Sequence, residues 1–203
     1  MTYNNIILVI SAPSGTGKSS VIDGLIGSDS SFSFIVSTTT RKQRENETNG
    51  TEYYFVLEDE FKKKIERGEF IEWAFVHQHY YGTTKKEVDR IIKKKDILVF
   101  DVDVHGVKNL KNKIEDAIFI LIIPPSLKTL RERLEKRGTD SEDSINIRIN
   151  DSKAWFNAYE LYDYILENDK IDNVISNIKA IVIAEKSKTH RKVSLIKAIM
   201  EDR

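Results

Sequence analysis

The 203-residue chain contains no cysteine, which excludes disulfides, thiolate nucleophiles, iron–sulfur clusters and cysteine-ligated zinc. It also has no excess of charge of one sign, since 32 Lys and Arg residues balance 32 Asp and Glu residues. Proteins that hold nucleic acid or an anionic membrane non-specifically depend on a strong positive field, which a neutral chain lacks. We therefore expect no nucleic-acid partner, and any phosphate ligand must be held by local cationic groups.

Long apolar runs are missing as well. The longest, Ile118–Ile123, is far below the roughly 20 residues needed to cross a bilayer. The N-terminus has no basic stretch, and Ile6–Ile10 is much shorter than the apolar core of a signal peptide. Together with the lack of cysteine, these features predict a cytoplasmic protein with no membrane association. The length predicts one domain with at most a small inserted lobe.

The apolar pattern predicts an α/β fold. Short aliphatic runs, of the kind buried on both faces of a parallel sheet, predict strands at Ile6–Ile10, Ile97–Phe100, Ala117–Ile123 and Tyr164–Leu166, and a weaker one at Phe34–Val36. Helical periodicity predicts helices at Lys18–Ile26, Val104–Asn112, Leu127–Arg137, Ser141–Leu161 and Ile171–Lys186. Strands that alternate with helices in this way form a parallel sheet flanked by helices.

Two segments interrupt this alternation. Residues 37–81 are rich in aromatics, Thr, Asn and Gly, and alternating pieces at Glu52–Val56 and Phe70–Val76 predict a small inserted β-rich lobe, with Gly82 as a candidate hinge. A helix at about 84–94 leads back to the sheet, and an Arg-rich segment predicts a helical lid. We expect a core of residues 1–36, 96–126 and 152–203, a lobe of residues 37–95 and a lid of residues 127–151. Residues 188–203 predict a short basic amphipathic helix.

The strongest chemical signal is the segment Ala12-Pro13-Ser14-Gly15-Thr16-Gly17-Lys18-Ser19, which matches the phosphate-binding loop pattern except that Ala12 replaces its first glycine. The segment follows a predicted strand and opens a predicted helix, so backbone N–H groups and the helix N-terminus converge on an anion. Lys18 adds a positive charge, and Ser19 would offer its hydroxyl to magnesium. The alternative, a glycine-rich turn with a chance lysine, requires all these features to coincide by accident.

Two carboxylates follow the predicted strand at Ile97–Phe100, at the edge where a parallel sheet presents its ligands. Asp101 could hold a water of a magnesium shell. Asp103 would face the same way if the strand continued. Capping of the next helix explains one of these carboxylates but not both.

Three more charged residues lie in the expected lobe. Arg41 and Arg44 are three residues apart in a polar loop, so their guanidinium groups could converge on one phosphate; a solvated charged loop is the alternative. Glu72 stands between Ile71 and Trp73 in an apolar strand, where a carboxylate costs free energy unless something hydrogen-bonds it. A carboxylate at this position therefore needs a hydrogen-bond donor beside it.

Together these motifs resemble the guanylate kinase family, in its bacterial single-domain form. The resemblance extends to about residue 186 and rests on segments in the family's order and spacing, namely Ala12–Ser19, Ser37–Arg44, Phe70–Ala74, Tyr80–Thr83, Asp101–Gly106 and Arg133–Gly138. It implies the P-loop kinase fold, with a GMP-binding lobe and a lid. It also implies transfer of a phosphoryl group from ATP to GMP in purine nucleotide metabolism, with Mg²⁺ as cofactor.

The resemblance further implies how GMP is bound. Guanine presents N–H donors at N1 and N2, whereas adenine has an acceptor at N1, so carboxylates select guanine. The residues implied near the base are Ser37, Glu72, Thr83 and Asp103, and those implied around the phosphate are Arg41, Arg44, Tyr53 and Tyr81. His105 stands where the family commonly has glutamine, and both a helix-start role and a ligand role remain open for it.

For ATP, the resemblance implies that arginines of the lid surround the β- and γ-phosphates. The expected catalytic residues are Lys18, Arg41, Arg133, Arg137 and Arg148. ATP would contact the loop from Ala12 to Ser19 and, near the adenine, Asn168, while Mg²⁺ would be held by Ser19 and Asp101. Trp73 and Trp155 are expected to be packing residues. The oligomeric state is open between a monomer and a homodimer.

Two other functions remain open. Some guanylate-kinase-like domains of scaffold proteins bind partners and have lost catalysis, but the intact loop with Lys18, and Asp101, argue against this reading. A related kinase for another phosphorylated acceptor, such as a ribose phosphate, would need the loop but not the base-reading residues. The joint presence of Ser37, Glu72 and Asp103 favours guanine.

Overall fold

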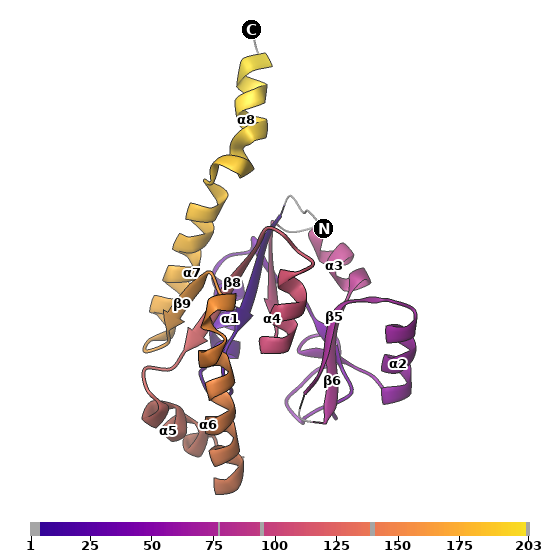
Figure 1. The fold of residues 1–203 in the computed structure, drawn as a ribbon, viewed down its shortest axis with the longest axis vertical. Coiled ribbons are helices and arrows are strands. Elements are labelled where there is room, and N and C mark those ends of the chain that lie inside the picture. The colour runs from indigo at the N-terminus through magenta and orange to yellow at the C-terminus, as the bar shows by residue number, and fades with distance from the viewer. Residues whose placement is uncertain (1–4, 77, 94–95, 139–140, 202–203) are drawn as a thin grey trace.

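A computed structural model describes residues 5–76, 78–93, 96–138 and 141–201. Its core is a five-stranded parallel sheet in the order β2-β7-β1-β8-β9 (Figure 1). The strands are β1 (Ile6–Ser11), β2 (Phe32–Phe34), β7 (Ile97–Asp101), β8 (Ala117–Ile123) and β9 (Tyr164–Glu167). Because β1 lies between β7 and β8, the loop that follows it opens at the centre of the carboxyl edge of the sheet.

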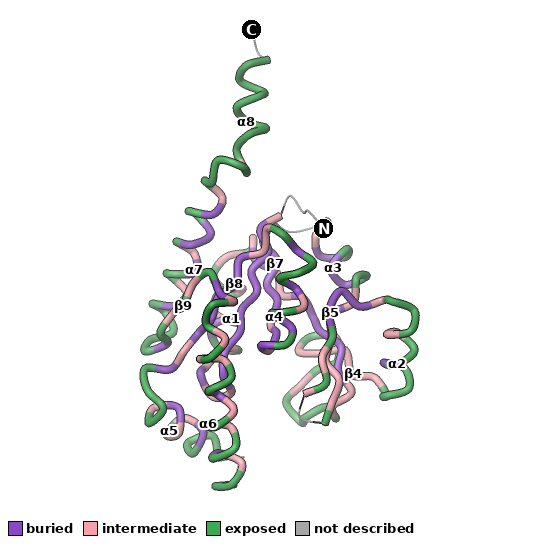
Figure 2. Tube along the Cα trace, viewed as in Figure 1, coloured by how far each residue is buried: buried purple, intermediate pink, exposed green. Residues whose placement is uncertain are grey.

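Helices cover both faces of this sheet. α1 (Lys18–Ser28) and α7 (Ile171–Lys186) pack on one face, while α3 (Lys85–Ile92) and α4 (Val104–Lys111) pack on the other. All of β1 is buried, with alternate residues entering the two apolar clusters. Figure 2 shows the buried residues concentrated in these central strands. The continuous apolar runs that predicted the strands are a consequence of this burial on two sides.

Three predicted elements were wrong in detail. β9 is an edge strand, and Ile165 is 49% exposed, so the strand is not buried on both faces. β2 ends at Phe34, two residues earlier than predicted, because Val36 turns toward the lobe and donates its N–H to Glu87 (3.3 Å). The helix predicted at Ser141–Leu161 is split into α6 (Glu142–Asn157) and a short 3₁₀ turn, η1 (Tyr159–Leu161).

A second sheet of four strands, in the order β4-β3-β6-β5, forms the inserted segment, which confirms the predicted β-rich insertion. Its strands are β3 (Ser37–Thr39), β4 (Tyr53–Phe55), β5 (Phe70–Val76) and β6 (His79–Thr84). The insertion also holds an unpredicted helix, α2 (Glu58–Glu66), whose one buried side chain, Phe61, stacks on Phe70 with ring centroids 4.3 Å apart. Apart from Phe61 and Ile65 the helix is polar, so it carries too few apolar residues to form a clear apolar stripe in the sequence.

Gly82, the candidate hinge, lies inside β6 and is buried. A Cβ there would come within 2.8 Å of the Glu72 carbonyl oxygen and of the Trp73 Cβ. Glycine therefore permits the close approach of β5 and β6, which is a packing role.

Two helical features complete the fold. α5 (Leu127–Arg137) and α6 pack together through Leu130, Leu134 and Ile145. α8 (Thr189–Glu201), the predicted C-terminal helix, extends from α7 away from the two sheets (Figure 1). Among the described residues, no helix combines the length and apolar character needed to cross a membrane.

Candidate active site

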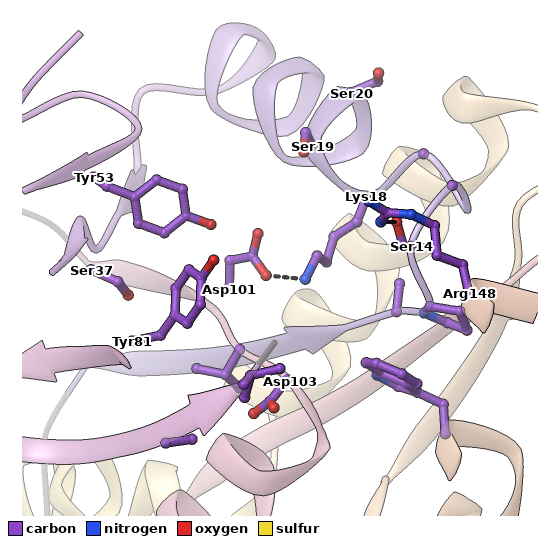
Figure 3. Close-up of a pocket in the computed structure, with 18 of the residues that line it drawn as sticks. Ser14, Lys18, Ser19, Ser20, Ser37, Tyr53, Tyr81, Asp101, Asp103 and Arg148 are labelled. Carbon is purple, nitrogen blue, oxygen red and sulfur yellow. Dashed lines mark hydrogen bonds and ion pairs between the residues drawn. The ribbon is translucent and has the colours of Figure 1, made fainter. Parts of the chain in front are cut away.

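A cleft of about 660 Å³ lies at the carboxyl edge of the core sheet, where the second sheet and the α5–α6 pair come together (Figure 3). Three groups of predicted site residues line it: the loop from Ala12 to Lys18, the hydroxyls and carboxylates of the lobe side, and the arginines of α5 and α6. From the lobe side and strand ends come Ser37, Tyr53, Glu72, Tyr81, Asp101 and Asp103. From the α5–α6 pair come Arg133, Arg137 and Arg148. The fold thus brings together segments more than 100 residues apart.

The loop between β1 and α1 has the backbone that an anion site needs. Gly15 (φ 87°) and Gly17 (φ 95°) are left-handed, a conformation that glycine adopts without strain. Gly17 caps α1 without any side-chain hydrogen bond to the first turn, so no side chain competes with an anion for those N–H groups. A Cβ on Gly15 would also come within 2.7 Å of Leu134 on α5.

Asn168, which is 2% exposed, supports the loop through a hydrogen bond. Its side-chain amide donates to the Thr16 carbonyl (2.7 Å), and a Cβ on Gly17 would come within 2.8 Å of the same nitrogen. Arg133 donates to the carbonyls of Thr16 (3.2 Å) and Asn168 (2.9 Å). The structure therefore puts Asn168 beneath the phosphate loop rather than among the residues that line the cleft.

The other two arginines of the α5–α6 pair that line the cleft differ in their contacts. Arg148 donates to the Ser14 hydroxyl (2.7 Å), so α6 contacts the loop directly. Arg137 lines the cleft from the exposed end of α5. Positive charge thus faces the loop from two helices.

Lys18 forms an ion pair with Asp101 across the cleft floor (Figure 3). The carboxylate lies at the end of β7 and the ammonium at the start of α1, which are adjacent because β7 pairs with β1. The hydroxyls of Tyr53 and Tyr81 point into the same space from the second sheet (Figure 3). Burial raises the pKa of Tyr53 well above its ordinary value, so this phenol remains a hydrogen-bond donor at neutral pH.

Glu72 is the most buried carboxylate lining the cleft, at 4% exposed. Thr83 donates its hydroxyl to Glu72 (2.8 Å) and lies 3.1 Å from the Ser37 hydroxyl, so the three side chains form one chain across β5, β6 and β3. Burial raises the pKa of Glu72 to about 7, and the nearby charge of Asp103 adds to this effect. The cleft therefore holds a buried carboxylate that accepts a hydrogen bond from Thr83 and whose charged form is disfavoured by burial.

Asp103 has both of the roles considered for it, as a helix cap and as a residue of the cleft. It caps α4 by accepting the N–H of Gly106 (2.8 Å), and it also lines the cleft. A Cβ on Gly106 would lie 3.3 Å from Glu72, so glycine keeps this end of the cleft open. His105 is exposed in the first turn of α4 and is absent from the cleft lining, while the cap itself is Asp103.

The two lobe arginines do not converge in this structure. Arg41 pairs with Glu47 (2.7 Å) and lies over the ring of Tyr53, 5.5 Å from its centroid. Arg44 is exposed and donates its backbone N–H to the same carboxylate (2.9 Å). Neither arginine lines the cleft. Glu47, which orders this loop, was not singled out in the sequence, because its partners follow no motif.

Sequence reasoning also missed Trp155. Its indole N–H donates to the Ser11 hydroxyl (3.0 Å), and its ring lines the cleft. Ser11 is the last residue of β1, directly before the phosphate loop. The packing role expected for Trp155 is thus only part of its contribution, and no local pattern could have shown a contact over 144 residues.

Comparisons with known proteins agree with this geometry. The family model of guanylate kinase matches residues 4–185. A guanylate kinase of Caldanaerobacter subterraneus is 39% identical over 197 residues, which is 97% of this chain and 96% of that protein. One of Thermotoga maritima is 39% identical over 91% of this chain and 89% of that protein. The crystal structure of guanylate kinase from Anaplasma phagocytophilum superposes with a TM-score of 0.77, at 29% identity, covering 98% of this chain and 95% of that one.

Proposed function

The chain belongs to the guanylate kinase family, and we propose how its own residues divide the work of transferring the γ-phosphoryl group of ATP to GMP. As a member of this family it is a nucleoside monophosphate kinase with the P-loop kinase fold. The observation that carries the proposal is that one cleft joins a phosphate loop with Lys18 to a buried carboxylate, Glu72. The loop suits a polyphosphate, and the carboxylate suits a base with hydrogen-bond donors.

ATP would place its phosphates in the loop from Ala12 to Ser19, against backbone N–H groups of the loop and of the first turn of α1. Lys18 would leave Asp101 and turn to the β- and γ-phosphates. Arg133 and Arg148 already contact the loop, so small movements would bring them to the phosphates. Arg137 would add charge from the end of α5. For Asn168, the contacts support holding the loop in shape rather than direct contact with the adenine.

The oxygen donors beside Lys18 fit magnesium. Ser19 offers a hydroxyl and Asp101 a carboxylate, and both line the cleft next to the loop. Hard oxygen ligands are those that Mg²⁺ takes in nucleotide sites, where it keeps several waters. When bound, Mg²⁺ would neutralise charge on the β- and γ-phosphates.

GMP would be read by the side chains at the lobe end of the cleft. Glu72 and Asp103 would accept from N1–H and N2–H of guanine, while Ser37 and Thr83 would supply hydroxyls beside them. Adenine, with an acceptor at N1, would leave the buried carboxylate unpaired. Tyr53 and Tyr81 would donate to the phosphate of GMP. The pKa of Glu72 near 7 means that binding of guanine also draws this group into its ionised form.

The phosphate of GMP would further need Arg41 and Arg44. Arg41 would exchange Glu47 for the phosphate, with Tyr53 still beneath it. Both arginines lie outside the cleft lining, so the lobe of residues 37–95 must move inward to deliver them. We propose that this movement, and that of a lid at residues 127–151, closes the cleft and expels water that would otherwise accept the phosphoryl group.

The reaction needs no general base. The second pKa of a phosphate monoester is near 6, so the acceptor oxygen of GMP is already largely ionised at pH 7. It attacks the γ-phosphorus, the bond from that phosphorus to the bridging oxygen breaks, and the electron pair stays on ADP. Lys18 and the arginines align the two nucleotides and neutralise the repulsion between them.

Steady-state kinetics with ATP and a panel of GMP, AMP, UMP and ribose 5-phosphate test this assignment. Wild-type protein should prefer GMP. Lys18→Ala should lower kcat by about 10²–10³ in a chain that still folds, whereas Lys153→Ala, an exposed lysine on α6, should not. Glu72→Gln should lower kcat/KM for GMP and reduce the preference for GMP over AMP, which such a site can hold at about 10⁴-fold. A folded Lys18→Ala variant with normal turnover, or an unchanged GMP-to-AMP ratio in Glu72→Gln, would refute the corresponding role.

A further inference from the structure

The strand that carries Glu72 has an irregularity directly before that residue. Phe70 and Glu72 pair with consecutive residues of β6, so Ile71 is an extra residue and forms a β-bulge. In a regular strand, side chains two residues apart share a face. Phe70 stacks on Phe61 of α2, whereas Glu72 lines the cleft. The bulge is therefore what turns the Glu72 side chain away from the face of Phe70 and toward the cleft.

The outer edge of β5 is held at this bulge from α4. β5 is an edge strand of the second sheet, so the main-chain groups on its outer side have no partner strand among the described residues. Lys113, just past the end of α4, donates its ammonium to the Ile71 carbonyl (2.6 Å). Asn109, in the last turn of α4, donates its side-chain amide to the Trp73 carbonyl (3.1 Å). The main chain is thus held on both sides of Glu72.

The same helix carries the second carboxylate of the expected base site. Asp103 caps the N-terminus of α4, and a Cβ on Gly106 would lie 3.3 Å from the carboxylate of Glu72. α4 lies between the core sheet and β5 (Figure 1), and Val107 shares an apolar cluster with Ile71. The separation of Glu72 from Asp103 therefore depends on how β5 is attached to α4.

We propose that Lys113 and Asn109 are positioning residues for guanine recognition. By holding the carbonyls on either side of Glu72, they keep its carboxylate and that of Asp103 at the spacing of the N–H donors of guanine. Lys113 makes the larger contribution, because a charged donor forms the stronger hydrogen bond and this one lies at the bulge itself. The inference rests on the proposed function, since it concerns the same base site. The closing movement proposed above can then turn about this attachment without separating the two carboxylates.

The charge of Lys113 acts on Glu72 in the same direction. Burial raises the pKa of Glu72, and the positive charge of Lys113 opposes this rise. It therefore favours the ionised carboxylate, which only accepts hydrogen bonds and so suits the donors of guanine.

Steady-state kinetics of two methionine variants test the role of Lys113. Lys111, two residues earlier, makes the same kind of contact elsewhere, since its ammonium donates to the Leu161 carbonyl (2.7 Å). Lys113→Met should raise KM for GMP about tenfold, with kcat and KM for ATP within about twofold of wild type, because one charge-assisted hydrogen bond beside Glu72 is lost. Lys111→Met should leave KM for GMP unchanged. Lys113→Arg retains a charged donor and should restore most of the affinity for GMP.

A second pair of variants tests the weaker contact. Asn109→Leu should raise KM for GMP by roughly threefold, as for one neutral hydrogen bond. Asn112→Leu is the matched control, because the Asn112 amide donates within the helix region to the Lys108 carbonyl (3.2 Å). An unchanged KM for GMP in both Lys113→Met and Asn109→Leu, or equal rises in these variants and their controls, would overturn the proposal.

Coupling to Glu72 separates this inference from the proposed function. If Lys113 acts through Glu72, Lys113→Met should change KM for GMP much less in a Glu72→Gln background than in wild type. A Glu72→Gln variant that keeps the wild-type preference for GMP over AMP would refute the proposed role of Glu72, and the inference with it. If Glu72→Gln loses that preference but the effect of Lys113→Met adds to it in full, the proposed function stands and the positioning role is wrong.

Discussion

The charged side chains of the cleft already have partners within the chain. Lys18 pairs with Asp101, and Arg41 pairs with Glu47. A charge withdrawn from water is costly unless it is paired, so these contacts keep the open cleft stable. The same contacts mean that substrate binding is an exchange of partners, in which a phosphate replaces a carboxylate. The effect expected of each substitution therefore depends on which phosphate replaces the carboxylate partner of that side chain.

Arg41 and Arg44 should contribute to GMP binding and little to ATP binding. Lysine at either position keeps the charge but loses the two-pronged hydrogen bonding of a guanidinium group. We expect Arg41→Lys and Arg44→Lys each to weaken GMP binding by about tenfold, as for the loss of one charge-assisted hydrogen bond. Calorimetric titration with GMP and with ATP separates the two sites, and Lys42→Ala, an exposed neighbour, is the control. Weaker ATP binding with unchanged GMP binding would show that the two nucleotide sites are assigned the wrong way round.

Glu72 should make stability depend on pH. Its pKa is about 7 in the folded chain against 4.5 ordinarily, so the folded state binds the proton more tightly than the unfolded state. This tighter proton binding contributes to the free energy of unfolding. The contribution is fully present below pH 4.5 and is lost as the pH rises through 7. The loss amounts to about 3 kcal/mol. Glutamine cannot ionise, so the variant does not lose this stability as the pH rises. The melting temperature of Glu72→Gln should therefore increase relative to that of wild type between about pH 5 and pH 8. Both proteins are measured without nucleotide. A difference in melting temperature between Glu72→Gln and wild type that is the same at about pH 5 and about pH 8 would contradict this account.

At the scale of elements, α6 connects the lid side of the cleft to the core sheet. Trp155 donates to Ser11 (3.0 Å), and two turns earlier on the same helix Arg148 contacts Ser14. Both contacts fall on the segment that contains the phosphate loop. A shift of α6 would therefore change the shape of the phosphate loop. Trp155 can influence the reaction in this way without touching the nucleotide.

Trp155→Phe removes this hydrogen bond and keeps an aromatic ring. Loss of one buried bond costs about 1 kcal/mol, or a fall of roughly 2–4 °C in melting temperature for a chain of this size. Slight displacement of Arg148 should lower kcat by about tenfold with little change in KM for GMP, since alignment rather than base binding is affected. Trp73→Phe is the matched control, because Trp73 is 40% exposed and outside the cleft lining. Equal falls in kcat for both variants would remove the special role of Trp155.

Elements differ in how well sequence predicts them, for physical reasons. The central strands were predicted because burial on two faces leaves a continuous apolar run, as in β1 and β8. β9 has the same composition, but its place at the edge of the sheet exposes Ile165, and edge position is a property of the topology. The motifs identified many of the residues that line the cleft, because phosphate and guanine chemistry restricts residue type, but they did not indicate Trp155, and they included Arg41 and Arg44, which lie outside the lining. The Arg41–Glu47 pair and the support of Thr16 by Asn168 depend on contacts that no spacing records.

At the scale of the whole molecule, the open cleft requires closure before transfer. Its walls come from three bodies: the core sheet, the second sheet and the α5–α6 pair. Arg41 and Arg44 lie outside its lining, while Lys18 and Arg148 lie within it. In the proposed mechanism these groups surround one pair of phosphates during transfer, and side-chain rotation alone does not move one sheet against another. Closure therefore has to be driven by both nucleotides, each of which binds one moving part to the core.

Small-angle X-ray scattering should show this closure as a fall in the radius of gyration when GMP and a non-hydrolysable ATP analogue with Mg²⁺ are both present. Either nucleotide alone should give a smaller fall, because it draws in only one of the two moving parts. Lys18→Ala is the matched comparison: because alanine cannot hold the phosphates, the ATP analogue should compact the chain less at equal occupancy. An unchanged radius of gyration at saturation with both ligands would mean that the arginines reach the cleft by loop rearrangement alone.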